Sequence, residues 1–185
     1  MDDDLAVLQR LQRGEGEALN TLIERYRQPV YRLAWRYLHL AHEAEDVAEE
    51  TFVRVYFKAA QFRPRGKVST WIFAIAANLC RDTLRRRRKD RQTQSIDLEP
   101  EDAPQDTLAD PRPRGVALAE QREQLEAVEA AIERLPHKLK FPFVFCVLEE
   151  RSQDECAEVL KTSRKTVETR IYRARQFLRD TLAAN

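Results

Sequence analysis

The sequence predicts an all-α protein of two small helical domains, an N-terminal helical bundle and a C-terminal helix-turn-helix domain, joined by a flexible acidic linker. Apolar residues recur at helical spacing in both halves of the 185-residue chain. The chain has only 4 glycines, which disfavours a turn-rich β fold. Residues 91–116 lack this periodicity and are rich in proline and acidic residues. We therefore expect domains at residues 1–90 and 117–185, with the linker at 91–116.

Two helices are predicted in the first sixty residues. One covers residues 17–40, and Pro29 should kink it or split it in two. The other covers residues 43–61 and buries an apolar stripe. Its outward face carries Asp46, Glu49, Glu50 and Arg54. Because acidic residues in the first turns of a helix are favourable through its dipole alone, this face has a purely structural interpretation as well.

A basic loop at residues 62–68 precedes a third helix, for which Ser69 or Thr70 is a suitable N-cap. Asn78 lies off the apolar stripe of this helix, and asparagine on a basic helix can pair with a base edge. The alternative is an ordinary solvated polar residue. The nucleic-acid-binding candidates of this region are Arg63, Arg65, Lys67, Ser69, Thr70, Asn78, Arg81, Arg85 and Arg88.

The second half starts with a predicted amphipathic helix that stops at Pro136. Its apolar stripe consists of Leu118, Leu125, Val128, Ile132 and Leu135. A short apolar helix with Pro142 in its early turns follows. Ser152 and Glu155 then form a capping box at the start of the next helix, and Ser163 is a suitable N-cap for the last one.

A helix, a short turn and a basic helix make up the helix-turn-helix pattern, whose second helix enters the major groove of DNA. Arginine can pair with guanine, glutamate can accept from cytosine, and tyrosine or threonine can contact a thymine methyl or a phosphate. The candidate DNA-binding residues of the last helix are Arg164, Lys165, Glu168, Thr169, Arg170, Tyr172, Arg173 and Arg175.

Positive charge is concentrated in two blocks, residues 81–91 and 161–179, although the formal net charge is only +1. Two cationic surfaces on one chain predict a protein that touches a polyanion at two places. A flexible linker cannot fix the spacing of two such contacts. We therefore expect the chain to be docked on a larger machine that holds both halves in register.

Catalytic, metal-binding and membrane functions have no support in the sequence. The chain has no phosphate-binding loop, nucleophile elbow or metal-ligand spacing, so we expect no enzyme activity, cofactor, metal or small-molecule substrate. No apolar run could span a bilayer, and an acidic N-terminus argues against export, so a cytoplasmic location is expected. Cys80, Cys146 and Cys156 have apolar helical neighbours and are interpreted as core residues, with a redox role for Cys146 and Cys156 as the alternative.

Two sets of motifs resemble bacterial RNA polymerase sigma factors of the extracytoplasmic-function (ECF) type, within the sigma-70 family. Residues 26–34, 44–56 and 69–78 resemble the promoter-melting domain of that family. Residues 135–136, 152–157 and 166–175 resemble its C-terminal DNA-binding domain. Each stretch alone is moderately specific, whereas their order along nearly the whole chain is strongly specific.

The resemblance implies a role for each surface. The helix carrying Asp46, Glu49 and Glu50 would bind the clamp coiled coil of core RNA polymerase. The loop at residues 62–70 and Asn78 would receive a flipped base of the −10 element, and the arginines of 81–91 would hold nearby phosphates. Residues 164–175 would read the −35 element as duplex. The linker would pass through polymerase channels, and an anti-sigma factor, often membrane-bound in this family, would hold the protein inactive.

The chain departs from the family pattern at several positions. Glu150 lies near a usual glycine, Cys156 replaces an aliphatic residue, Glu49 stands where glutamine is frequent, and Glu168 replaces a usual lysine or arginine. Glu168 leaves the −35 sequence preference open. Two other functions also stay open from the residues: a free-standing helix-turn-helix regulator with an N-terminal sensor or dimerisation domain, and an RNA-binding adaptor.

Overall fold

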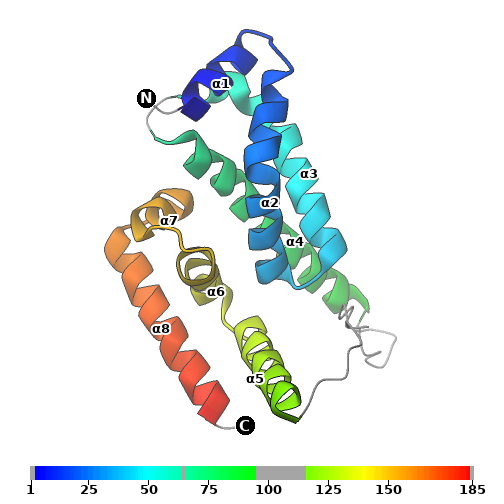
Figure 1. The fold of residues 1–185 in the computed structure, drawn as a ribbon, viewed down its shortest axis with the longest axis vertical. Helices are drawn as coiled ribbons and strands as arrows, with labels where there is room; N and C mark the ends of the chain where they lie inside the picture. Colours follow the sequence, from blue (N-terminus) through cyan, green and yellow to red (C-terminus); the bar gives the residue numbers. More distant parts are fainter. Residues whose placement is uncertain (1–2, 64–65, 95–115, 184–185) are drawn as a thin grey trace. The chain divides into compact units, whose positions relative to one another are not determined.

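The computed structural model describes residues 3–63, 66–94 and 116–183, with side chains described outside 91–122 (Figure 1). Every regular element within these residues is helical, as the sequence predicts. Contacts divide the chain into two compact units, and the main boundary falls after residue 102. The predicted linker at 91–116 lies almost entirely outside the described residues, although helix α4 continues to Gln94 and helix α5 begins at Val116.

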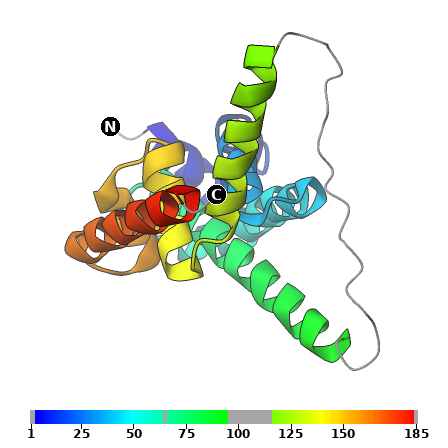
Figure 2. The ribbon, with the colours of Figure 1, turned by 90° about the horizontal axis from the view of Figure 1, so that it is seen from below.

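The N-terminal unit is built around three long helices that pack side by side (Figure 1). Its elements are α1 (Asp3–Gln12), α2 (Ala18–Leu38), α3 (Ala41–Lys58), the 3-10 turn η1 (Ala59–Gln61) and α4 (Val68–Gln94). The predicted stripes supply the core, which includes Leu22, Leu33, Tyr37, Val47, Phe52, Val55, Ile72, Ile75 and Leu79. The end of α4 extends beyond the other helices of this unit (Figure 2).

Pro29 does not split the second helix, because α2 runs through it without interruption. A proline removes one backbone donor and crowds the preceding turn. The residues after Pro29 pack into the core, and Val30, Leu33 and Ala34 are fully buried. We infer that tertiary packing on both sides of Pro29 holds the helix together across it.

One arginine fastens α4 to the turn between α2 and α3. Arg87 donates through Nε to Oε1 of Glu43 at 2.6 Å and through Nη2 to Oε2 of the same carboxylate. Its two terminal nitrogens also donate to the backbone carbonyl of Leu38 at 3.2 Å. The Arg87 and Glu43 side chains are only 22% and 16% exposed. This charge-assisted fork is of the strong type, because both partners are largely removed from water.

The C-terminal unit contains α5 (Val116–Glu133), α6 (His137–Phe143), the π turn η2 (Val144–Leu148), α7 (Gln153–Leu160) and α8 (Arg164–Ala183). Its core combines an aromatic pair, Phe141 and Phe145, with the predicted stripe of the last helix. That stripe, Val167, Ile171, Ala174 and Leu178, is buried throughout. Helix α8 therefore turns one face inward along its length.

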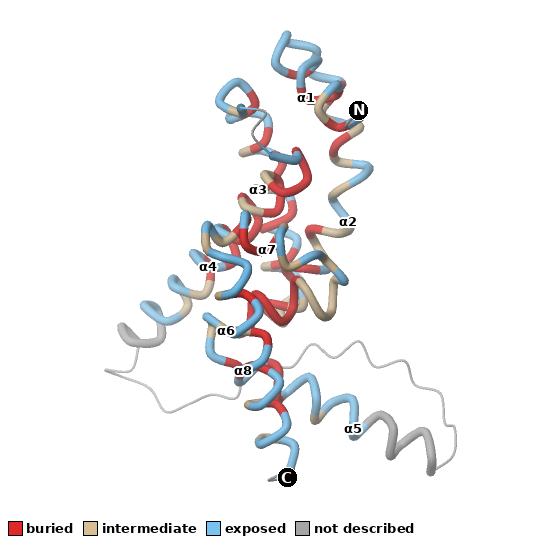
Figure 3. Tube along the Cα trace, turned by 90° about the vertical axis from the view of Figure 1, so that its left-hand side faces the viewer, coloured by how far each residue is buried: buried red, intermediate tan, exposed pale blue. Residues whose placement is uncertain are grey.

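Two predictions of buried residues in this unit are wrong. Ile132 near the end of α5 and Leu135 just after it are buried, but Leu125 and Val128 are 60% and 37% exposed. The side chain of Leu118 lies outside the described residues. Much of α5 is exposed in the burial map (Figure 3), because periodicity indicates a potential inward face but not whether a neighbour covers it. Cys146 is likewise only partly buried, whereas Cys80 and Cys156 are core residues as predicted.

Both predicted N-caps of the helix-turn-helix are present. Ser152 Oγ accepts from the backbone N–H of Glu155 at 3.1 Å, and the Glu155 carboxylate accepts from the backbone N–H of Ser152 at 3.3 Å. This reciprocal arrangement is a capping box. Ser163 Oγ accepts from the backbone N–H of Thr166 at 3.2 Å and caps α8.

Two residues beside these caps adopt the left-handed backbone region. Glu150 has a φ of 53° before α7, and Lys161 has a φ of 51° in the turn before α8. A side chain in this region costs about 1–2 kcal/mol, a cost that glycine avoids. A glycine at Glu150 would adopt this backbone geometry without strain.

Glu150→Gly is therefore expected to stabilise the C-terminal unit by about 0.5 kcal/mol, because relief of the left-handed strain exceeds the entropic cost of glycine in the unfolded chain. The measurement is amide hydrogen exchange of α7 and α8 in the full chain, which reports the local opening free energy. Glu149, with a φ of −97°, supplies the control. Glu149→Gly should lower the same opening free energy by about 0.5–1 kcal/mol, and equal effects of both variants would contradict the explanation.

Candidate nucleic-acid interface

Helix α3 presents an acidic surface at the positions predicted to bind a protein partner. Asp46 and Glu49 are exposed. Glu50 and Arg54 are half-exposed and pair with each other, with 2.7 Å between Glu50 Oε1 and Arg54 Nε. An exposed pair four residues apart on a helix contributes only a few tenths of a kcal/mol. Both side chains can therefore exchange this contact for one with a partner at little cost.

Large apolar side chains adjoin this acidic surface, and the sequence analysis did not single them out. Val53, Tyr56 and Phe57 are 47%, 50% and 73% exposed, and the two rings contact each other edge to face. All three fall off the buried stripe of α3, which contains Val47, Thr51, Phe52 and Val55. A helical wheel of residues 41–58 would have revealed them. Exposed apolar residues beside charges are typical of protein-binding surfaces.

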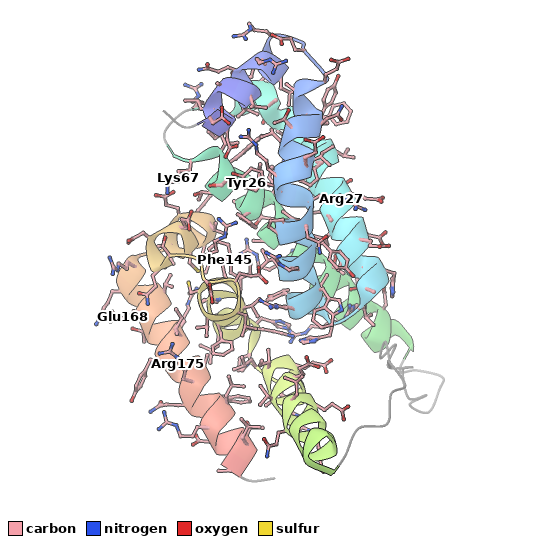
Figure 4. All side chains as sticks on the ribbon, viewed as in Figure 1. Tyr26, Arg27, Lys67, Phe145, Glu168 and Arg175 are labelled. Carbon is pink, nitrogen blue, oxygen red and sulfur yellow. The ribbon has the colours of Figure 1, made fainter. Side chains whose placement is uncertain are left out.

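The loop before α4 is held at its start by two contacts. Gln12 Nε2 donates to the carbonyl of Ala59 at 2.8 Å, and the rings of Phe62 and Trp71 lie 5.1 Å apart. Arg63 and Lys67 are exposed, and Lys67 projects away from the helices of its unit (Figure 4). Arg65 lies outside the described residues. The fixed loop base thus orients at least two cationic side chains toward solvent.

Neither Ser69 nor Thr70 caps α4, because the helix already begins at Val68. The backbone N–H of Trp71 bonds to the carbonyl of Lys67 at 3.2 Å, which places the start of the helix before both predicted caps. Ser69 and Thr70 are only 9% and 7% exposed. Their predicted contact with a base would therefore need the loop before them to move, although Thr70 Oγ1 has no hydrogen-bond partner among the described residues.

Farther along α4, one exposed face carries the other predicted nucleic-acid-binding residues. Asn78, Arg81, Arg85 and Arg88 are spaced three or four residues apart and are all exposed. Arg81 donates to the side-chain oxygen of Asn78 and, through Nε, to the carbonyl of Ala77 at 3.2 Å. The face is cationic, and Asn78 is oriented by the arginine beside it.

The expectation that every arginine of residues 81–91 holds phosphate is wrong for Arg87. Its guanidinium is engaged by Glu43 and Leu38, and its side chain is only 22% exposed. Arg87 falls on the inner side of the same helix that presents Arg85 and Arg88 to solvent. Sequence spacing could have indicated this, because Arg87 lies four residues after the buried Thr83.

Helix α8 presents the second cationic face. Arg164, Lys165, Glu168, Thr169, Tyr172, Arg173 and Arg175 are all exposed. Glu168 projects outward from α8 (Figure 4) and accepts from Lys165 Nζ at 3.3 Å. Arg164 pairs with Asp154 of α7 at 3.2 Å, and Gln176 donates to the Tyr172 hydroxyl at 2.9 Å. This face offers several donors, hydroxyl groups and one carboxylate acceptor to a partner.

Arg170 differs from the other candidates of the last helix. It is only partly exposed and lies beside the buried stripe, next to Ile171. On the helical wheel it falls on the opposite edge of that stripe from Arg175. Arg170 and Arg175 therefore flank the buried stripe, and Arg170 differs in being only partly exposed, so its contact with DNA stays a prediction.

Two protein families match the chain, one in each unit. The sigma-70 region 2 family matches residues 22–90, and the sigma-70 region 4 family matches residues 125–178. The first match contains the acidic surface of α3 and the basic face of α4. The second contains α7, the turn and most of α8. The two units therefore define a protein of the sigma-70 class.

Relatives along the whole chain narrow this class. The chain is 30% identical over 182 residues to the ECF RNA polymerase sigma factor SigW of Bacillus subtilis, covering 95% of this chain and 94% of that protein. It is 31% identical to the RNA polymerase sigma-H factor of Pseudomonas aeruginosa, covering 96% and 92% of the two chains. The chain belongs to the ECF family of RNA polymerase sigma factors. As a member it binds core RNA polymerase and directs transcription initiation at promoter DNA.

Solved structures agree with this fold. CnrH, solved in complex with the cytosolic domain of CnrY, matches with a TM-score of 0.72 and 24% identity, over 100% of this chain and 99% of that one. RpoE of Bartonella quintana, solved with the anti-sigma factor NepR, matches with a TM-score of 0.66 and 17% identity, over 90% and 97%.

Among the described residues, none of the helices has the length and apolar character to cross a membrane.

The free energy of unfolding distinguishes Arg87, which is bonded to Glu43, from the exposed arginines of α4. Arg87→Gln is expected to lower the free energy of unfolding of the N-terminal unit by about 1–3 kcal/mol, because the Glu43 carboxylate loses a charged hydrogen-bond partner in a mostly buried place. Urea unfolding followed by the fluorescence of Trp35 and Trp71 measures this change.

Arg88→Gln is the matched control, since Arg88 is exposed on the same helix. Its effect on the same unfolding transition should stay within about 0.5 kcal/mol. Equal losses for the two variants would show that Arg87 has no special structural role.

Proposed function

We propose that the three surfaces described above divide the work of promoter recognition: the α3 surface binds core polymerase, the α4 face contacts the −10 element, and the α8 face reads the −35 element. The observation that carries the proposal is that the exposed residues of α4 and α8 form separate cationic faces, one in each unit. Each face lies within a region that matches its own family model.

The α3 surface is suited to a protein rather than to DNA. Asp46, Glu49 and Glu50 would repel phosphates, while Tyr56 and Phe57 offer apolar area that a protein partner can cover. Charge complementarity would steer the encounter, and burial of the aromatic rings would stabilise the bound state. Core RNA polymerase is the partner that family membership supplies.

The α4 face and the loop before it are suited to a single strand. Arg63 and Lys67 are exposed on the loop, and Asn78 and Arg81 lie about one turn apart on the exposed face of the helix. Arginines can hold the backbone phosphates while the asparagine amide pairs with the edge of an unstacked base. Extrusion of a base costs a few kcal/mol, which contacts of this kind must offset. With the predicted domains at residues 1–90 and 117–185, all of these contacts with the −10 element would come from the first domain.

The α8 face is suited to duplex DNA. In a helix-turn-helix, residues near the start of the recognition helix contact base edges, and later residues contact the backbone. Arg164, Lys165, Glu168 and Thr169 occupy the first two turns of α8. Glu168 can accept a hydrogen bond from the cytosine amino group, so it would select a C·G pair at one position of the −35 element.

Control by an anti-sigma factor completes the proposal. The structures most relevant to it are those of CnrH, solved with the cytosolic domain of CnrY, and of RpoE, solved with NepR. In this chain, the exposed acidic and aromatic residues of α3 and the exposed Leu125 and Val128 of α5 are surfaces that such a partner could cover. Co-purification followed by mapping of the interface would test it, and a freely active protein would contradict it.

The direct test is reconstitution. The purified chain is mixed with bacterial core RNA polymerase and genomic fragments, and core polymerase alone is the control. New, discrete start sites with shared upstream sequences are expected. Binding of duplex DNA by the chain alone, with no new start sites, would favour the free-standing regulator instead.

Asp46→Lys is expected to abolish co-elution with core polymerase, because it reverses an exposed charge of the acidic surface. The fold should be unaffected, since Asp46 is exposed. Glu24→Lys, an equally exposed charge reversal on α2, is the control and should co-elute normally. Wild-type affinity of the Asp46 variant would remove α3 from the interface.

Glu168→Gln is expected to relax discrimination at one base pair of the −35 element by about 1–3 kcal/mol, because a carboxylate that can only accept is replaced by an amide that also donates and can pair with adenine. Arg173→Gln should instead weaken binding about equally at all sequences and reduce its salt dependence. Competition binding of the holoenzyme to a promoter set with single changes in the −35 element measures both. An unchanged sequence profile for Glu168→Gln would exclude base contact by this residue.

A further inference from the structure

Two of the three cysteines lie together in the C-terminal unit, although ten positions separate them in the chain. Cys146 belongs to η2, and Cys156 belongs to α7. The carbonyl oxygen of Ser152 accepts from both residues, from Cys146 Sγ at 3.8 Å and from the backbone N–H of Cys156 at 3.1 Å. The shared acceptor places the Cys146 sulfur close to the backbone of Cys156, and each thiol shifts the pKa of the other.

The two thiols differ in access to solvent. Cys156 is 0% exposed, whereas Cys146 is only partly buried. The hydrogen bond from Cys156 lowers the pKa of Cys146, because it stabilises the thiolate. The same bond and burial raise the pKa of Cys156. A reactive cysteine is partly exposed and has thiolate character, and a second thiol beside it can resolve an oxidised sulfur. Cys146 and Cys156 meet these two descriptions respectively.

We propose that Cys146 and Cys156 form a reversible oxidation site, which a hydroperoxide converts to an intramolecular disulfide between η2 and α7. The Cys146 thiolate attacks a peroxide oxygen, the O–O bond breaks, and hydroxide or alkoxide leaves while Cys146 becomes a sulfenic acid. The Cys156 sulfur then attacks the Cys146 sulfur, the S–O bond breaks, and water leaves with the proton of Cys156. Two thiols have given two electrons to the peroxide, and a dithiol reductant reverses the change.

The location gives this bond a structural consequence. It would close a ring over the segment between η2 and α7, which contains Glu150 in its left-handed conformation and the Ser152 cap. Helix α7 is the first helix of the helix-turn-helix. The disulfide would therefore tie the start of this motif to the aromatic core that contains Phe145.

The experiment uses the full chain with Cys80→Ser, so that only the proposed pair can react. Hydrogen peroxide is added, and intact mass and alkylation after denaturation are measured. A loss of two hydrogen atoms and of both alkylatable thiols is expected in a monomeric product, and dithiothreitol should restore both. In the wild type, one thiol of the three should survive and map to Cys80, since burial raises the pKa of Cys80 to about 12.

Two variants test the order of the steps. Cys156→Ala should leave a sulfenic acid on Cys146 that dimedone traps, and Cys146→Ser should leave Cys156 alkylatable after peroxide treatment. Circular dichroism establishes that each variant is folded. The proposal is overturned if the Cys80→Ser chain keeps both thiols under peroxide that oxidises glutathione, if Cys146 proceeds to sulfinic acid beside a free Cys156, or if only intermolecular disulfides form.

Discussion

The packing of α4 against α2 and α3 is the constraint on which the N-terminal unit depends. One side of α4 supplies Ile72, Ile75, Leu79 and Thr83 to the core, and the fork from Arg87 to Glu43 fixes its continuation. Because side chains on a helix keep a fixed angular order, burial of this side determines which residues face solvent. The exposure of Asn78, Arg81, Arg85 and Arg88 is a consequence of the core and not an independent feature.

The C-terminal unit obeys a similar constraint with different chemistry. Its proposed DNA-reading geometry depends on how α7 ends and α8 begins, and this turn is set by the Ser163 cap and by the left-handed Lys161. Caps of this kind contribute about 1 kcal/mol each, and a left-handed side chain costs a similar amount. The turn is thus held by opposing terms of similar size, and the buried stripe of α8 supplies the margin.

Sequence patterns predicted those parts of the molecule that depend on local chemistry. The helical class, the capping box, the Ser163 cap and the α8 stripe all follow from residue type and spacing, as does exposure of Asn78. The failures share one cause, which is that spacing does not reveal neighbours. Leu125 has the right spacing for burial but is not covered by the described residues, and Arg87 has the right charge for phosphate but lies against Glu43. The predicted caps Ser69 and Thr70 lie inside α4, because the first hydrogen bond of this helix is accepted by the Lys67 carbonyl.

The ion pairs of the two cationic faces differ from the Arg87 fork in a way that bears on function. The Arg85–Asp82 pair is mostly exposed, with 3.7 Å between its charged atoms. The Arg164–Asp154 and Lys165–Glu168 pairs are also mostly exposed, at 3.2 and 3.3 Å. Such pairs contribute between 0 and about 1 kcal/mol, so phosphates can replace the acidic partners without loss of the fold. Before a phosphate replaces them, these acidic side chains reduce the positive potential of each face. The formal net charge of the whole chain is only +1. Weak attraction of this kind limits nonspecific binding by the free chain. Tight binding would then require the promoter contacts and the polymerase contact to act together, which is the behaviour that an initiation factor needs.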